Sequence, residues 1–326
     1  MCGQSMHNRA LRRSHRWTLW FSLEFFGAGY DSTVTIAGFY LCPEGIVLGA
    51  DSTSSVPIQD GLHYFNFTQK LFEIGEGSTL GLLTWGLGGL GPVSFRTLLA
   101  DLADELVANP PGDVSDVAQR WIDKFWIAYT NFKYVDQCNQ LHQKLPYDPL
   151  AAGANPGART EEEEAVYLTL KQALVVGFCI GGYVLPDRTP QAMFMIFDPI
   201  NVKPQFQIAH AESELWWGVP NIIDRLITGA DVNLVDAVID SGKWTGTKNE
   251  LLDVVTAQRF RHGTLPMRDA VDYVHSCIHS TIKAMKFSNM SQVCGGPIEI
   301  AVITSDRKFR WVRHKQWDAA IVDGDI

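Results

Sequence analysis

The stretch from Thr33 to Ser52, TVTIAGFYLCPEGIVLGADS, decides the fold. Two apolar segments, 33–41 and 45–52, flank the residues CPEG, where Pro43 and Gly45 supply a turn. Runs of apolar residues bounded by turn residues predict two buried strands joined as a hairpin. Threonines stand at one end of this hairpin and Asp51 at the other, so it is either a plain hairpin or the frame of an active site.

The composition is that of an ordinary globular protein. Of the 326 residues, 46% are apolar and 19% are charged, and the formal net charge of -9 argues against a nucleic-acid partner. The six cysteines form no C-x-x-C pair and no zinc-like spacing, which favours a reduced, cytoplasmic protein. No run of about 18 uncharged apolar residues predicts a membrane span.

The N-terminal segment differs from the rest of the chain. Four arginines between residues 9 and 16 precede the apolar run WTLWFSLEFF, which loosely resembles a signal peptide, but Glu24 interrupts the run and no A-x-A site follows. We expect residues 1–32 to form an extension or propeptide and residues 33–326 to form one domain.

Further along the chain, the periodicity predicts strands, then helices, then strands again. A loop follows the hairpin to about Phe67, and strands are expected at KLFEIG and TLGLLTWG. Helices are expected over 95–106 and 114–134, strands over 172–183, 191–199 and 205–213, and a short helix over 221–229. A long helix capped by Thr264 should run from 267 to 285, followed by strands at IEIAVIT and FRWVRH. This order predicts an α+β fold in which helices cover antiparallel sheets.

Two other motifs suggest chemistry but fit it poorly. The glycine-rich GLGGLGP, 86–92, lacks the Lys-Ser/Thr of a phosphate-binding loop, so its glycines are expected to turn a strand into a helix. His275 and His279 share a helix face, but Ser276 stands where a zinc protease needs glutamate. We therefore predict no metal and no organic cofactor.

Several features together resemble the proteasome β-subunit family of N-terminal-nucleophile (Ntn) hydrolases. These are the hairpin TIAGFYLCPEGIVLGADS, Lys70 in TQKLFEIG, Gly86 after a strand, VVGFCIGGY, the long helix, and CGGPIEIAVITSDRKFRWV. The resemblance covers about residues 33 to 313. It implies a four-layer αββα sandwich of antiparallel sheets, and assembly into a homo-oligomeric ring or with sister subunits.

The resemblance also implies the chemistry of the site. In the family, a threonine becomes the first residue of the mature chain, and its hydroxyl attacks a peptide carbonyl while its amino group moves the proton. Asp51 and Lys70 match the acidic and basic positions of the family, and Gly86 is a candidate oxyanion donor through its N–H. Counting back from Asp51 puts the nucleophile at Thr35, whereas matching TIAG to the family's start allows Thr33.

The far side of the site departs from the family pattern. In NMSQVCGG, Ser291 stands at the usual aspartate position and Cys294 at the usual serine position. Ser291 can form hydrogen bonds but supplies no fixed negative charge.

These features support three hypotheses. The first is a threonine-type endopeptidase that hydrolyses peptide or protein substrates after its N-terminus is processed. The second is a non-catalytic structural or binding subunit with the same fold and an uncleaved N-terminus, and the third is a related amidase that acts on a small amide.

Overall fold

The computed structural model describes residues 35–58, 61–150, 155–260, 262–289 and 293–315. Thr33 and Ser291 lie outside these ranges, as does the whole of the expected extension 1–32. The chain divides into two compact units. The larger contains residues 32–220 and 263–326, and the smaller includes residues 221–262.

The expected hairpin is present in the larger unit. Strands β1 (Ile36–Cys42) and β2 (Gly45–Ala50) pair antiparallel from Cys42 opposite Gly45 to Ala37 opposite Ala50. Every residue of both strands is buried, as the run of apolar residues predicted. The hairpin forms the centre of a five-stranded antiparallel sheet in the order β10-β1-β2-β11-β12, completed by β10 (Ser213–Gly218), β11 (Glu299–Thr304) and β12 (Arg307–Arg313).

A second five-stranded antiparallel sheet follows the order of the chain. Its strands are β5 (Leu71–Glu73), β6 (Leu80–Gly86), β7 (Val176–Gly182), β8 (Gln191–Phe197) and β9 (Gln207–Ile208). β1 and β2 contact β6, and β2 also contacts β7, so the two sheets face each other. Trp85 of β6 stacks on Trp217 of β10, with ring centroids 4.0 Å apart. Paired rings of this kind stabilise the contact between the sheets.

The loop expected between the hairpin and Phe67 is wrong. Strands β3 (Ser54–Ile58) and β4 (Gly61–Phe65) form a two-stranded antiparallel ribbon there. Pro57 has no N–H to give to a strand ladder, so its presence argued against a strand. It is tolerated because the ribbon is separate from both large sheets and has only one ladder.

Helices α3 (Phe95–Ala108) and α4 (Val114–Thr130) were predicted from their apolar spacing. α4 packs against β7 and β8, and its Trp121 and Phe125 make edge-to-face contacts with Phe178. The single helix expected over 114–134 is in fact two, because α4 ends near Asn131 and α5 (Lys133–His142) begins after Phe132.

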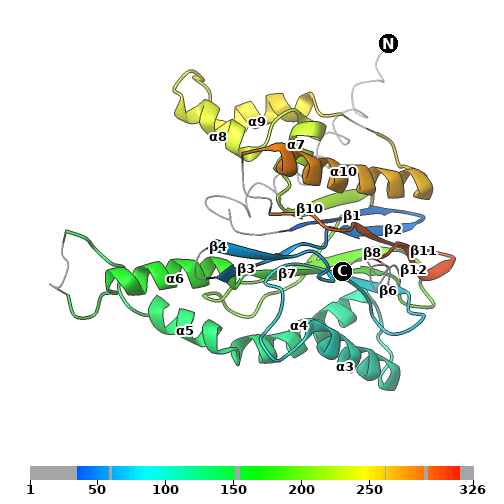
Figure 1. Ribbon diagram of the computed structural model, residues 1–326. Helices are drawn as coiled ribbons and strands as arrows, with labels where there is room; N and C mark the ends of the chain where they lie inside the picture. Colours follow the sequence, from blue (N-terminus) through cyan, green and yellow to red (C-terminus); the bar gives the residue numbers. More distant parts are fainter. Residues whose placement is uncertain (1–34, 59–60, 151–154, 261, 290–292, 316–326) are drawn as a thin grey trace, which may run out of the picture. The chain divides into compact units, whose positions relative to one another are not determined.

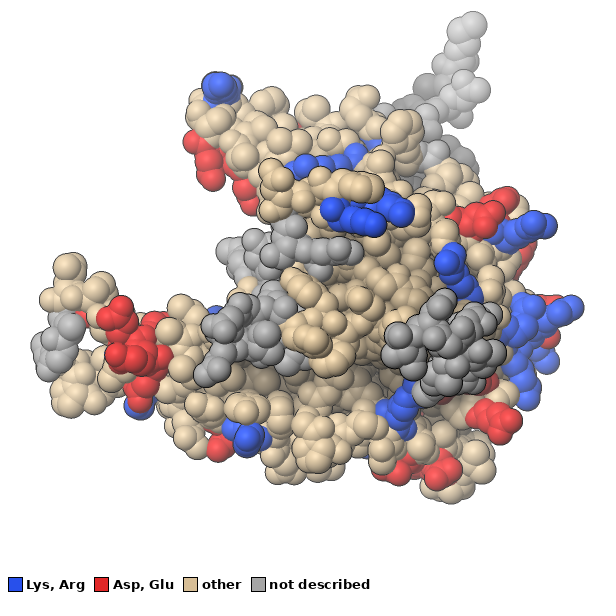
Figure 2. All heavy atoms as spheres, viewed as in Figure 1, with Lys and Arg blue, Asp and Glu red and all other residues tan. Residues whose placement is uncertain are grey.

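The acidic run EEEE, 161–164, begins a helix. Helix α6 (Glu161–Ala173) starts with a capping box, in which Thr160 accepts the N–H of Glu163 and the Glu163 carboxylate accepts the N–H of Thr160. All four glutamates lie in the first turn, where the helix dipole favours negative charge. Figure 2 shows acidic side chains gathered at this end of α6.

The long helix α10 (Met267–Phe287) covers the other face of the first sheet, where it contacts β1 and β2 (Figure 1). Gly49 permits this close approach, because a Cβ there would lie 2.5 Å from Cγ1 of Val274. The expected cap is wrong. Pro266 occupies the N-cap position, while the Thr264 hydroxyl donates to Oε1 of Glu212 at 3.1 Å.

The smaller unit contains three helices within its described residues: α7 (Asn221–Thr228), α8 (Val232–Asp240) and α9 (Lys248–Ala257). α7 was predicted, but α8 and α9 were not. Asp231 caps α8 by accepting the N–H of Leu234 and also forms an ion pair with Arg225.

The observed fold is therefore α+β with two antiparallel sheets, as the order of elements predicted. In the part of the chain that the structure describes, no helix combines the length and apolar character that a membrane crossing needs.

Candidate active site

Asp51 follows the last residue of β2, and its carboxylate is fully buried. Oδ1 accepts the N–H of Ile36 at 3.1 Å and faces Nζ of Lys70 at 2.5 Å. Oδ2 accepts two further backbone N–H groups, from Thr53 at 3.2 Å and Gly295 at 2.9 Å. A buried carboxylate needs partners for both oxygens, and these four donors supply them.

Lys70 directly precedes β5 and is 4% exposed. Burial lowers the pKa of its ammonium group from the ordinary value, and the Asp51 carboxylate opposes this shift. Strand pairing fixes the backbone here, because the Lys70 carbonyl accepts the N–H of Thr84 at 2.9 Å. The structure places Lys70 beside Asp51 across 19 residues of chain.

Thr35 precedes β1 and is 1% exposed. Its carbonyl accepts the N–H of Val219 at 2.9 Å. The chain passes close to it at Gly218, which has a φ of +92° and where a Cβ would lie 1.8 Å from the Thr35 oxygen. Only glycine tolerates both conditions, so Gly218 permits the backbone to fix Thr35.

Asp51 forms two hydrogen bonds with Ile36, the residue that follows Thr35. Its own N–H donates to the carbonyl of Ile36 at 3.0 Å, while its side chain accepts the N–H of Ile36. This places the carboxylate and its lysine one residue from Thr35. The hairpin thereby brings together Thr35, Asp51 and Lys70, three of the residues singled out in the sequence.

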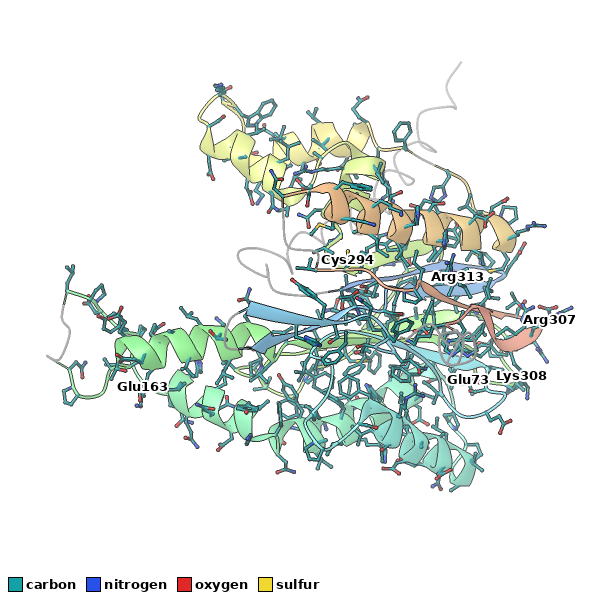
Figure 3. The ribbon with its side chains drawn as sticks, viewed as in Figure 1. Glu73, Glu163, Cys294, Arg307, Lys308 and Arg313 are labelled. Carbon is teal, nitrogen blue, oxygen red and sulfur yellow. The ribbon has the colours of Figure 1, made fainter. Side chains whose placement is uncertain are left out.

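Cys294 lies just before β11, 0% exposed, at the position where the family pattern has serine (Figure 3). Burial, and secondarily the Asp51 charge, raise the pKa of its thiol to about 12, whereas Lys70 lowers it. The thiol is thus neutral near pH 7 and unsuited to act as the nucleophile. The neighbouring Gly295 donates its N–H to Asp51, a role that the sequence did not predict.

The other candidates are placed less directly. Gly86 ends β6 opposite Val176, two residues beyond Thr84, which pairs with Lys70. Strand pairing thus connects it to the site, and its oxyanion role stays a prediction. The roles assigned to Thr33 and Ser291 fall on residues outside the described ranges.

A second buried ion pair lies on the neighbouring strand, and sequence reasoning missed it. Glu299 of β11 is 0% exposed and pairs with Lys315, whose Nζ lies 3.0 Å from Oε2. Oε1 lies 2.8 Å from Nδ1 of His314. The available signal was Glu299 itself, the one charged residue in the apolar strand IEIAVIT.

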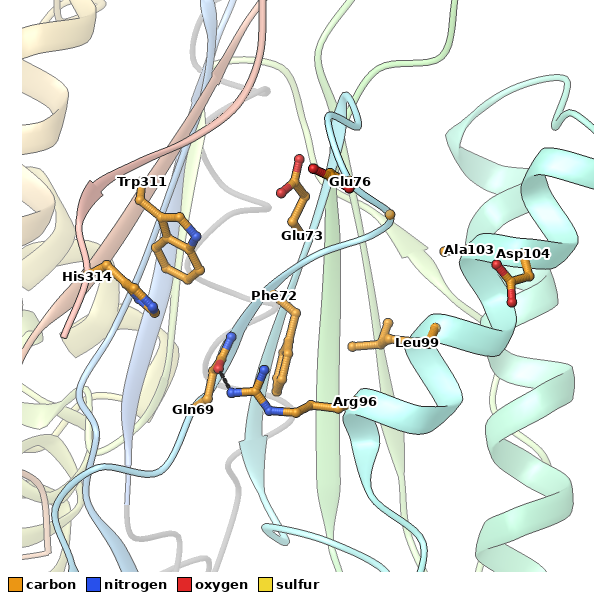
Figure 4. A pocket seen from close by; sticks show the side chains of 12 residues that line it. Gln69, Phe72, Glu73, Glu76, Arg96, Leu99, Ala103, Asp104, Trp311 and His314 are labelled. Carbon is orange, nitrogen blue, oxygen red and sulfur yellow. Dashed lines mark hydrogen bonds between the residues drawn. The ribbon is translucent and has the colours of Figure 1, made fainter. Parts of the chain in front are cut away.

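A cavity of about 520 Å³ lies against the segment that leads into β5. Figure 4 shows Trp311 and His314 on one side of it, and Gln69, Phe72 and Arg96 on another. Arg96 donates to Oε1 of Gln69 and lies over the Phe72 ring, 5.8 Å from its centroid. The cavity is therefore lined by Gln69, which precedes Lys70 in the sequence, and by His314, whose side chain contacts Glu299.

Within the described ranges, no three His, Cys, Asp or Glu side chains are grouped so that they could hold a metal ion. His275 and His279 stack with their ring centroids 5.8 Å apart, and Nη1 of Arg313 lies 2.7 Å from Nε2 of His275. A guanidinium at that nitrogen occupies the position that a metal would need.

Comparison with known proteins gave matches among solved structures alone. No protein-family model matches the sequence, and no curated protein matches it. A helical assembly of the Anbu complex from Pseudomonas aeruginosa matches with 14% identity and a TM-score of 0.47, over 88% of this chain and 90% of that one.

Two further Anbu structures are similar. One from Hyphomicrobium sp. strain MC1 has 10% identity and a TM-score of 0.45, over 89% of this chain and 94% of that one. The other, described as an ancestral beta-subunit from Yersinia bercovieri, has 10% identity and a TM-score of 0.42, over 89% and 91%. At these values the similarity says nothing about the activity, substrate or assembly of this chain.

The expected membership in the proteasome β-subunit family is wrong. The similar structures reported are Anbu proteins, which form a distinct, proteasome-related family. That expectation came from motifs in the hairpin and around Asp51 and Lys70. Different protein families can have the same arrangement of such motifs, so the motifs do not identify the family.

Proposed function

We propose that this protein is an N-terminal-nucleophile hydrolase of amide bonds, with Thr35 as its nucleophile and a peptide as its substrate. The observation that carries the proposal is the buried ion pair of Asp51 and Lys70. Asp51 accepts the N–H of Ile36, the residue that follows Thr35. A buried charged pair is costly to maintain, and such pairs are frequent at sites of catalysis.

The chemistry requires cleavage of the bond between Val34 and Thr35. The α-amine then released has an ordinary pKa of about 7.7 to 8.0, which suits a general base near neutral pH. It takes the proton of the Thr35 hydroxyl while Oγ attacks the substrate carbonyl, and it passes that proton to the leaving amine. Water then hydrolyses the resulting ester and regenerates Thr35.

The neighbouring groups would assist these steps. A positive Lys70 near the new N-terminus disfavours a proton on the α-amine and so keeps it available as a base. Asp51 holds Lys70 in place and, through Ile36, fixes the backbone next to the nucleophile. The Gly86 N–H is the proposed oxyanion donor.

Architecture and assembly complete the proposal. α10 on the first sheet, the facing sheets and α4 on the second sheet support a four-layer αββα sandwich. Association with further copies of the chain is proposed alongside it, and one similar structure is described as a helical assembly. A cytoplasmic location stays a prediction from the sequence.

A non-catalytic subunit is the second candidate, and one observation favours it. Thr35 and Lys70 are 1% and 4% exposed, so neither is open to a substrate in this form of the chain. If Val34 stays attached, the amine remains in an amide and cannot act as a base.

The test combines the intact mass of the purified protein with peptide turnover. We expect a chain beginning at Thr35, with turnover abolished by Thr35→Ala and retained in the matched control Thr33→Ala. Incubation with an electrophilic peptide should add one equivalent of mass to the N-terminal fragment. An uncleaved chain without turnover would instead support the structural subunit, and turnover restricted to small amides would replace the peptide substrate.

A further inference from the structure

Lys315 connects three parts of the chain around the candidate site. Its Nζ lies 3.0 Å from Oε2 of Glu299 and donates to the carbonyl of Thr68, also at 3.0 Å. Thr68 is two residues before Lys70, and its N–H donates to the carbonyl of Ser52, next to Asp51. One ammonium group thus ties the segment that carries Lys70 to β11.

Glu299 anchors this connection from the interior of the sheet. Its backbone is paired with Ala50, the residue before Asp51, so the two carboxylates emerge from neighbouring strands at the same end. The side chain of Glu299 is 0% exposed and that of Lys315 6% exposed. His314 occupies the other side of Glu299 and faces the cavity in Figure 4.

Lys315 of the second pair also acts on the first pair through its charge. Burial lowers the pKa of Lys70, Asp51 and Cys294 raise it, and the Lys315 charge lowers it further. Burial likewise lowers the pKa of Lys315, which Glu299 and Asp51 raise and Arg96 lowers. In a dry interior a unit charge acts over greater distances than in water.

We propose that Lys315 and Glu299 are positioning residues, which hold the Thr68–Lys70 segment in register and set the electrostatic field at Lys70. Their effect on turnover rests on the proposed function, whereas their effect on Lys70 does not. The pair would fix both the place and the charge state of the lysine beside Thr35.

The experiment follows the titration of Lys70 by 13C NMR in the full chain labelled at lysine Cε, with its signal assigned from Lys70→Arg. Lys315→Met removes a positive neighbour and should raise the titration midpoint by about one pH unit. Glu299→Gln removes a negative charge from the same interior and should lower the Lys70 midpoint by roughly 0.3 pH unit, through the direct interaction of that charge with Lys70. Opposite shifts are a result that loss of structure alone does not produce.

The controls separate charge from folding. Glu299→Gln/Lys315→Met removes both charges, avoids leaving either one buried alone, and should give a midpoint between those of the two single variants, about 0.7 pH unit above the wild-type value. Lys315→Arg retains the charge and should leave it unchanged, as should Lys308→Met, which alters an exposed lysine on β12. If Lys315→Met does not fold, the double variant and Glu299→Gln decide the result.

Unchanged midpoints, or shifts in the same direction in both single variants, would overturn the proposal. A second readout is the pH profile of kcat/KM, whose acid limb should move to higher pH in Lys315→Met. If the protein has no turnover at all, the proposed function fails, but the NMR titration still decides the role of the pair.

Discussion

Two buried carboxylate–lysine pairs lie on neighbouring strands, and they are held in different ways. In both pairs the carboxylate side chain is 0% exposed and the lysine side chain 6% exposed. Asp51 accepts three backbone N–H groups in addition to its lysine, whereas Glu299 faces the side chains of Lys315 and His314. The two carboxylates are therefore equally buried, but the position of Asp51 is fixed more rigidly than that of Glu299.

The difference follows from the kind of partner. Backbone donors belong to the chain itself, so the N–H groups of Ile36, Thr53 and Gly295 hold Asp51 without losing side-chain entropy. Side-chain partners must be ordered individually, and they lie in the last residues that the structure describes. Asp51 is thus a fixed point of the fold, and Glu299 depends on the segment that follows β12.

The largest effect expected from this comparison is that of Asp51→Asn. The new amide places an NH₂ either against the N–H groups of Thr53 and Gly295 or against Lys70 and the Ile36 N–H, and it leaves the Lys70 charge unpaired. We expect a loss of about 3–5 kcal/mol in the free energy of unfolding. Urea denaturation at pH 7 measures this loss. A loss under about 1 kcal/mol would show that the hydrogen bonds and the ion pair of Asp51 contribute little to stability.

Glu299→Gln should cost less, about 2 kcal/mol in the same assay. Its amide oxygen can still accept from Lys315, which also retains the carbonyl of Thr68. A cost equal to that of Asp51→Asn would remove the distinction between the two pairs.

Cys294 lies beside the first pair and allows a test by pH. Its folded pKa of about 12 lies above the ordinary 9.0, so the stability from this neutral thiol is complete below pH 9 and is lost as the pH rises toward 12. Compared with Cys294→Ala, the wild-type protein should lose about 2 kcal/mol more between pH 8 and pH 10.5. Unfolding curves under reducing conditions measure this, and parallel pH profiles would show that the thiol does not titrate as described.

The smallest effect is expected at an exposed pair on the same sheet. Arg307 and Asp306 lie 3.7 Å apart with side chains 64% and 74% exposed. Water and salt screen such a pair, so Asp306→Asn should change the unfolding free energy by less than about 0.5 kcal/mol. A larger change would mean that burial is not what separates the two interior pairs from the surface.

Much of this architecture could be predicted, because the first hairpin, the main helices and the C-terminal strands carry strong apolar periods. Several of the elements that were missed carry weak ones. The β3–β4 ribbon contains Pro57, α9 has no buried residues, and the break between α4 and α5 at Asn131 has neither glycine nor proline to mark it. Local propensity could not reveal these features, since they depend on what each segment packs against.

The candidate site likewise contains residues that could be named from the sequence and residues that could not. The resemblance of the hairpin to the proteasome β-subunit family implied Thr35 and Asp51, and it matched Lys70 to the family's basic position. The partners of Glu299 could not be found, because His314 and Lys315 reach it only through the pairing of β11 with β12. The Gly295 N–H was missed for a similar reason, since a backbone donor has no signature in the choice of residue.

By itself, the sequence determined which segments are buried and that the hairpin ends with Thr35 and Asp51 at its open end, since apolar period and turn residues are local properties. The tertiary structure decided which charges share the interior. Lys70, Gly295, Glu299 and Lys315 come together only because four strands end at the same place. The free energy of a buried charge depends on such neighbours rather than on its place in the chain.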